Sequence, residues 1–95
     1  MTKKYYTIGE VAKILNVKTY NIRYWESVIP QLKPSKILNG IRHYQENEIE
    51  KLKKVKELIY EEKLSVESVN KFFNEYLKKE KLKKELKEIL KLLEN

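Results

Sequence analysis

Residues 7–26 read TIGEVAKILNVKTYNIRYWE, and this stretch decides the fold. Its opening Thr-Ile-Gly-Glu has the form of a capping box, and apolar side chains follow at helical spacing, so we expect a helix over about residues 8–15. Asn16 tolerates the left-handed conformation that ends helices, and Val17 can fill the corner that follows. A second helix is expected over about residues 19–28. Two short helices joined by a three-residue turn predict a helix-turn-helix.

The second predicted helix has two different faces. One is apolar and typical of a core, and it carries Ile22, Trp25 and, just beyond the helix, Ile29. The other face has the spacing i, i+3, i+4, i+7 and comprises Tyr20, Arg23, Tyr24 and Ser27. It is too polar for a core and too aromatic for a surface that contacts only solvent. Guanidinium groups pair with phosphate or guanine, and tyrosine hydroxyls donate to phosphate oxygens. The stripe therefore favours contact with nucleic acid over the alternative of a solvated face.

A hairpin is predicted farther along the chain, where residues 35–44 read SKILNGIRHY. Asn-Gly between two short apolar runs is typical of a type I′ turn, which needs positive φ at both central positions. We therefore expect residues 37–38 to pair with residues 41–44 as antiparallel strands. A two-stranded hairpin is marginally stable in water, so it must pack on helices or contact a ligand.

The second half of the chain reads as helices. Apolar positions predict a helix over about Glu46 to Glu62, which Lys63 and Leu64 interrupt, and Ser65 then caps a short helix that carries Phe73. In the last segment, apolar residues recur at intervals of four, three and four, as in a coiled-coil seam: Leu82, Leu86, Ile89 and Leu93. This seam predicts a homodimer, and the alternative is that the segment folds back on its own domain. The expected fold is mostly α, with a two-stranded β-wing and a C-terminal helical extension.

Basic charge is concentrated in the first half of the chain. Residues 1–44 hold eight basic and two acidic side chains, whereas residues 45–95 hold thirteen and twelve. Six of the ten aromatic residues also lie in the first half. This asymmetry indicates an anionic partner for the first half and a structural role for the second.

Composition argues against several other classes of protein. The 95 residues include no cysteine, no aspartate and one histidine, so nucleophilic and metal-assisted catalysis lack their usual groups. We expect no enzyme activity, no metal site and no cofactor. No stretch has the length of a membrane span and the N-terminus has no signal-peptide pattern, so a cytoplasmic, nucleoid-associated protein with no membrane partner is expected.

Four segments of the chain form a pattern of their own: YTIGEVAKILNV at residues 6–17, IRYWE at 22–26, NGIRHY at 39–44 and EIEKLKKVKELIYEEKLSVESV at 48–69. In order and spacing, these segments resemble the MerR family of bacterial winged helix-turn-helix transcription regulators, over about residues 5–73. Two positions depart from the family's pattern: Lys18 and Gln45 stand where a helix cap is usual, so the helices that follow are expected to begin weakly or at shifted residues.

The resemblance implies a regulator that binds double-stranded DNA through a recognition helix in the major groove and a wing on flanking phosphates. Residues 1–76 would form the DNA-binding domain and residues 77–95 a dimerisation helix. The short form of the family lacks an effector-binding domain, so no small-molecule effector is expected. The residues implicated in DNA binding are Lys18, Thr19, Tyr20, Arg23, Tyr24, Lys36 and Arg42.

Two questions stay open at the level of sequence. Arg42 can contact a phosphate, or it can form a structural ion pair with Glu26, the only nearby carboxylate in the basic half. The function can also differ from transcription regulation. One alternative is an architectural or excisionase-like factor that bends or coats DNA; another, of a different class, is a coiled-coil adaptor for protein interactions.

Overall fold

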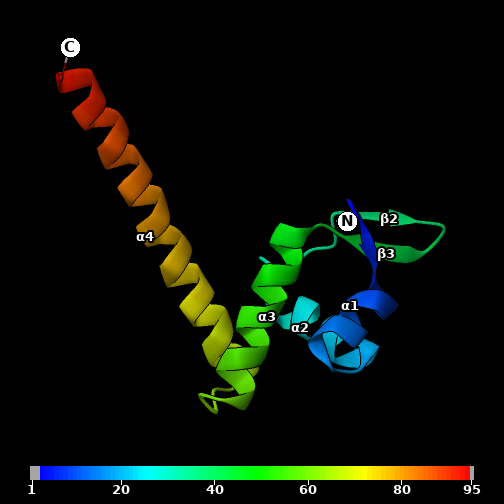
Figure 1. Cartoon of the computed structure of the whole chain (residues 1–95). Coiled ribbons are helices and arrows are strands. Elements are labelled where there is room, and N and C mark those ends of the chain that lie inside the picture. The colour runs from blue at the N-terminus through cyan, green and yellow to red at the C-terminus, as the bar shows by residue number, and fades with distance from the viewer. Residues whose placement is uncertain (1–2, 95) are drawn as a thin grey trace.

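The computed structural model describes residues 3–94, with all of their side chains except that of Leu77. Four helices and a small antiparallel sheet make up the fold, which confirms the expected class (Figure 1). In chain order the elements are β1 (Tyr6–Thr7), α1 (Ile8–Leu15), α2 (Thr19–Val28), β2 (Lys36–Leu38), β3 (Ile41–Tyr44), α3 (Glu46–Tyr60) and α4 (Val66–Leu93).

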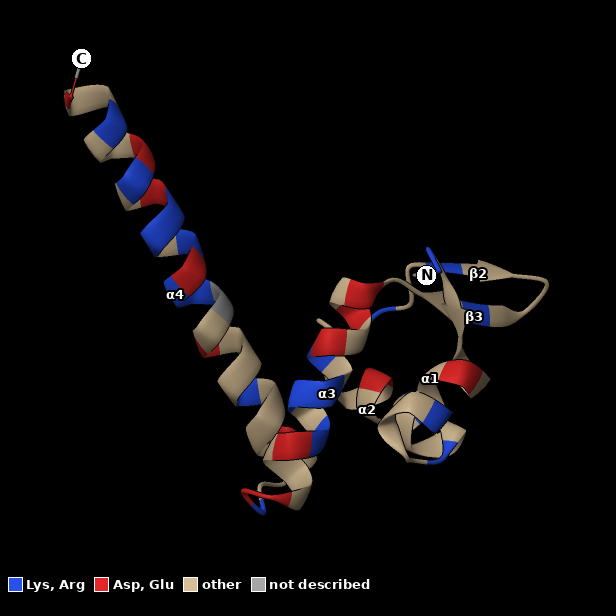
Figure 2. Cartoon of the chain, in the orientation of Figure 1, with Lys and Arg blue, Asp and Glu red and all other residues tan. Residues whose placement is uncertain are grey.

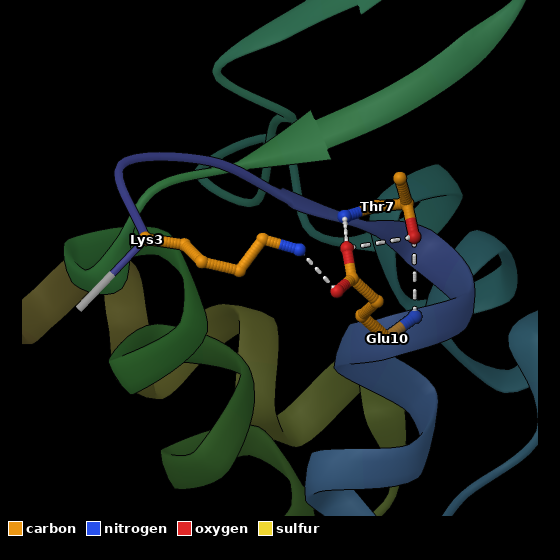
Figure 3. Close-up of polar contacts among 3 residues, drawn as sticks. All are labelled: Lys3, Thr7 and Glu10. Atoms are coloured by element: carbon orange, nitrogen blue, oxygen red, sulfur yellow. Dashed lines mark hydrogen bonds and ion pairs between the residues drawn. The ribbon is translucent and has the colours of Figure 1, made fainter. Parts of the chain in front are cut away.

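The helix-turn-helix has the predicted bounds and caps. At the start of α1, the Thr7 N–H donates to Oε1 of Glu10 at 2.9 Å, and the Glu10 N–H donates to Oγ1 of Thr7 at 3.3 Å, as a capping box requires (Figure 3). Lys3 pairs with the other carboxylate oxygen, and this contact together with the Thr7 N–H lowers the pKa of Glu10 to about 2. At the other end of α1, Asn16 adopts φ 57° and ψ 49°, the predicted left-handed cap.

The sheet has the order β1-β3-β2, and both of its strand pairs are antiparallel. In the predicted hairpin, Leu38 pairs with Ile41, while Asn39 and Gly40 have φ values of 50° and 77°, as a type I′ turn requires. This hairpin, β2 and β3 with their turn, is the wing. The third strand, β1, was not predicted, because two residues are too few to show a strand periodicity.

The hydrophobic core lies where α1, α2, α3, β3 and the first turns of α4 meet. Trp25 and Ile22 of α2 are buried as predicted, with 3% and 0% of their surface exposed. In α3, Leu58 is buried, whereas its neighbour Ile59 is only partly buried. The core comprises Ile8, Val11, Ala12, Leu15, Ile22, Trp25, Ile29, Leu32, Tyr44, Ile49, Leu52, Val55, Leu58, Val69 and Phe73.

The C-terminal part differs from the expectation. Helix α3 ends at Tyr60, two residues before the predicted end, and Lys63 takes a left-handed φ of 58° in the connection to α4. The expected short helix after Ser65 is wrong: α4 is one continuous helix of 28 residues. No glycine or proline interrupts this segment, so nothing in the backbone stops the helix near Phe73.

The far half of α4 extends away from the other elements (Figure 1). Its predicted seam is exposed to solvent, with 58% of Leu82, 59% of Leu86, 53% of Ile89 and 76% of Leu93 accessible. The alternative in which this segment folds back on its own domain is therefore wrong. Over residues 3–94, none of the helices combines the length and apolar character that crossing a membrane requires.

Candidate nucleic-acid interface

The predicted stripe on α2 faces solvent. Tyr20 and Tyr24 expose 67% and 51% of their surface, and Arg23 is also exposed. The hydroxyl of Ser27 donates to the carbonyl oxygen of Tyr24 at 2.6 Å, so it is used within the helix. Among the described residues, no hydrogen bond or ion pair engages the side chains of Tyr20, Arg23 and Tyr24. These three side chains are therefore available to an external partner.

The start of α2 lies beside this stripe. The helix begins at Thr19 as predicted, although Lys18 supplies no capping side chain. Instead, Oδ1 of Asn21 accepts a hydrogen bond from the Lys18 N–H at 3.1 Å. The expected shift of the helix start is therefore wrong, and the same holds for α3, which begins at Glu46 after an uncapped Gln45. Helix N-termini carry a partial positive charge, which the exposed Lys18 ammonium reinforces.

The wing presents Lys36 in a fixed position. Its Nζ atom lies over the ring of Tyr5, 3.8 Å from the ring centroid, and the side chain is partly buried. Such a cation–π contact restricts the long lysine side chain while its N–H groups can still donate. Sequence reasoning missed Tyr5, because it precedes the helix-turn-helix and lies 31 positions from Lys36 in the sequence.

Arg42 forms the structural ion pair that the sequence left as one of two alternatives. Its Nε atom lies 2.9 Å from Oε1 of Glu26. The other carboxylate oxygen, Oε2, accepts a hydrogen bond from the hydroxyl of Tyr44 at 2.5 Å. Glu26 is nearly buried, with 8% of its side chain exposed, whereas Arg42 retains 33%. Contact of Arg42 with DNA stays a prediction, and its remaining guanidinium N–H groups are the ones that could make it.

The surroundings of Tyr44 show that α2 and the wing meet here. Burial raises the pKa of the Tyr44 hydroxyl far above its usual value, and the hydrogen bond to Glu26 and the charge of that carboxylate raise it further. The positive charges of Arg42 and Arg23 act in the opposite direction on this pKa. The contacts of Glu26 with Arg42 and Tyr44 therefore join α2 to strand β3 of the wing.

Charges divide between the two halves of the structure (Figure 2). Basic residues lie on α1, in the turn before α2 and on both wing strands, with few acidic neighbours. Helices α3 and α4 carry both signs, and several are paired along the helix, as in Lys53–Glu50 at 3.2 Å and Lys83–Glu80 at 3.7 Å. Within residues 3–94, no three acidic or histidine side chains come together as a metal site would need. The helix-turn-helix and the wing thus carry an excess of basic residues, and residues 78–91 of α4 form a second basic stretch, with seven lysines and three glutamates.

The chain was compared with known protein families and with curated proteins. A family model described as MerR HTH family regulatory protein matches residues 6–76, which cover the helix-turn-helix, the wing, α3 and the first part of α4. A search among curated proteins finds no significant match.

Proposed function

The chain belongs to the MerR family of helix-turn-helix regulatory proteins, which are DNA-binding transcription regulators and not enzymes, and from this premise we propose how it binds DNA. Helix α2 enters the major groove of double-stranded DNA and reads its sequence, while the wing contacts the flanking phosphates. The protein is thus a sequence-specific transcription regulator that acts at chromosomal DNA in the cytoplasm.

One observation carries this proposal: the exposed stripe of α2. A helix placed in the major groove needs side chains that reach base edges, and Arg23 can donate two hydrogen bonds to O6 and N7 of guanine. Tyr20 and Tyr24 flank it, with hydroxyl groups that can donate to phosphate or to a base. All three are exposed and without partners among residues 3–94, while Ile22 and Trp25 hold the opposite face in the core.

The remaining candidate residues would position the protein on the DNA backbone. Lys18 and Thr19 lie at the N-terminus of α2, where a phosphate is favoured by the helix dipole. Lys36 and Arg42 lie on neighbouring wing strands. Contacts of these residues with phosphate fix orientation and add affinity that depends on salt.

We also propose that the protein binds DNA as a homodimer through residues 77–95. A single helix-turn-helix with one wing covers little DNA, and pairing two copies doubles the sequence that is read. The exposed seam of α4 consists of Leu82, Leu86, Ile89 and Leu93, flanked by lysine and glutamate. Because it is shorter than three heptads, the pairing should be modest and dependent on concentration.

The second candidate function is that of an architectural factor, which would bind along DNA with little sequence preference. The basic charge of the first half supports either function, because phosphate contacts do not depend on sequence. The stripe on α2 favours the regulator, because Arg23 and its tyrosine neighbours have the chemistry for base readout. An adaptor that uses only its coiled coil would leave this stripe without a role.

Fluorescence anisotropy with two duplexes tests the proposal. One duplex carries a site selected by the wild-type protein from random DNA, and the other has a scrambled sequence. Arg23→Ala should lose discrimination between the two, by about 1–3 kcal/mol for a bidentate base contact. Lys36→Ala should lower the affinity for both duplexes to the same extent. It should also reduce the salt dependence of the affinity by the amount that roughly one phosphate contact contributes. If Arg23→Ala lost the same affinity for both duplexes, the result would favour the architectural factor instead.

A further inference from the structure

Glu26 is an unexpected residue for a DNA-binding surface. It is the single acidic residue between Thr19 and Tyr44, a segment that contains the whole of α2 and the wing. A carboxylate near a phosphate-binding surface opposes DNA binding through charge repulsion. If α2 and the wing bind DNA, we therefore expect Glu26 to make a favourable contribution that offsets this repulsion.

The contacts of Glu26 join the wing to α2. Arg42 and Tyr44 are two positions apart in β3, so their side chains project from the same face of the strand. Each binds a different oxygen of the carboxylate, Arg42 at 2.9 Å and Tyr44 at 2.5 Å. Two contacts from one strand to one carboxylate fix both the distance and the orientation of β3 relative to α2.

The geometry also leaves part of Arg42 free. Arginine has five N–H donors, and the contact with Glu26 uses the one on Nε. The guanidinium is planar and rigid, so fixing Nε also fixes the direction of the two Nη groups. With 33% of the side chain exposed, these groups can reach a phosphate while Glu26 holds the other edge.

We propose that Glu26 is a positioning residue for DNA binding: it fixes the wing against the recognition helix and orients the Nη groups of Arg42 toward a flanking phosphate. This inference rests on the proposed function, because it assumes that α2 and the wing contact the same duplex. It assigns to the one carboxylate of the surface a favourable effect on DNA binding, which acts through Arg42.

The sign of the effect separates this role from simple electrostatics. Glu26→Ala and Glu26→Gln each remove a negative charge, which by itself strengthens binding to DNA. If Glu26 positions Arg42, both variants bind the selected duplex more weakly, Glu26→Ala by about tenfold or more and Glu26→Gln by less, because its amide oxygen can still accept one hydrogen bond. Affinity that stays equal or rises in both variants would overturn the proposal.

A double-mutant cycle shows whether Glu26 acts through Arg42. In an Arg42→Ala background, Glu26→Gln should change the affinity for the selected duplex by less than about twofold, because the group that it positions is gone. A full effect of Glu26→Gln in that background would contradict the proposed route. Should Glu26→Ala fail to fold, Glu26→Gln and the Arg42→Ala background still decide the question.

Two control variants separate positioning from charge and from stability. Glu57→Gln removes the same charge on α3, where Glu57 is exposed and pairs with Lys54. Val55→Ala lowers stability through the core by a change in α3, outside the sequence of α2 and the wing. All proteins are compared at a temperature where circular dichroism shows them folded, and neither control should weaken binding. A wild-type protein that binds no duplex would refute the proposed function itself, which is a different outcome from a Glu26 variant that binds as well as wild type.

Discussion

The hydroxyl of Tyr44 offers a direct measure of how strongly the wing is held. In Tyr44→Phe, Glu26 loses the hydrogen bond of 2.5 Å but keeps its ion pair with Arg42. Hydrogen bonds to charged groups contribute about 1.5–3 kcal/mol, and both partners here are shielded from water, with Tyr44 1% exposed and the Glu26 side chain 8%. We expect the free energy of unfolding to fall by about 2 kcal/mol, which for a small domain corresponds to a decrease in Tm of roughly 10 °C.

Urea unfolding followed by circular dichroism measures this loss, at one fixed protein concentration because dimerisation would affect the midpoint. The matched control is Tyr24→Phe, which removes a hydroxyl from a side chain that is 51% exposed, and it should change the free energy of unfolding by less than about 0.5 kcal/mol. If Tyr44→Phe were as stable as this control, the hydrogen bond to Glu26 would not hold the wing in solution.

The contact between Tyr44 and Glu26 also predicts that the free energy of unfolding depends on pH. The pKa of Tyr44 is raised in the folded state, mainly by burial and then by Glu26, so the neutral phenol is favoured on folding. Its contribution to stability is fully present below the unfolded pKa of about 10 and is lost as the pH rises above that value. Wild type should therefore lose stability above pH 10 more steeply than Tyr44→Phe. Parallel stability curves for the two proteins in this range would contradict the assignment.

Three further predictions concern other parts of the chain. Gly40→Ala should lower stability by about 1 kcal/mol in urea unfolding, because φ is 77° there while an added Cβ meets no atom within 4 Å; an unchanged midpoint would exclude the type I′ turn. Leu86→Asp should abolish the dimer in sedimentation analysis at micromolar concentration, because it places a charge in the apolar seam; wild type that is monomeric both free and on DNA would refute the dimer. The carboxyl of Glu10 should titrate near pH 2 by NMR, and Lys3→Ala should raise this pKa. A wild-type midpoint near 4.5 would show that the capping box and Lys3 do not lower the pKa of Glu10. Its favourable contribution to stability is present above pH 4.5 and is lost as the pH falls toward 2.

The helix-turn-helix and the wing could be predicted from sequence because their signals are local. The capping box at Thr7, the left-handed Asn16 and the Asn39–Gly40 turn each depend on backbone preferences within a few residues, and the structure confirms all three. The continuous helix α4 was missed because its apolar pattern changes after Phe73, although helix propensity stays high throughout.

The candidate site could be predicted only in part. The exposed stripe of α2 follows from helical periodicity, and the buried positions of Ile22 and Trp25 confirm the orientation of that helix. The contact between Tyr44 and Glu26 joins residues 18 positions apart, and no local pattern marks it. An ion pair between Arg42 and Glu26 could be named as an alternative from charge alone, but choosing it needed the packing of the wing on α2.

Selection from random double-stranded DNA with the 95-residue protein tests the central claim most directly. Successive rounds of binding and amplification, followed by sequencing, report whether the protein prefers any sequence. We predict one enriched motif, whose affinity falls with salt by roughly 0.9 in log affinity per unit of log salt for each phosphate neutralised, and no enrichment when the selection is repeated with Arg23→Ala. Binding of the wild-type protein without an enriched motif, or no binding to duplex DNA at low salt, would contradict the account.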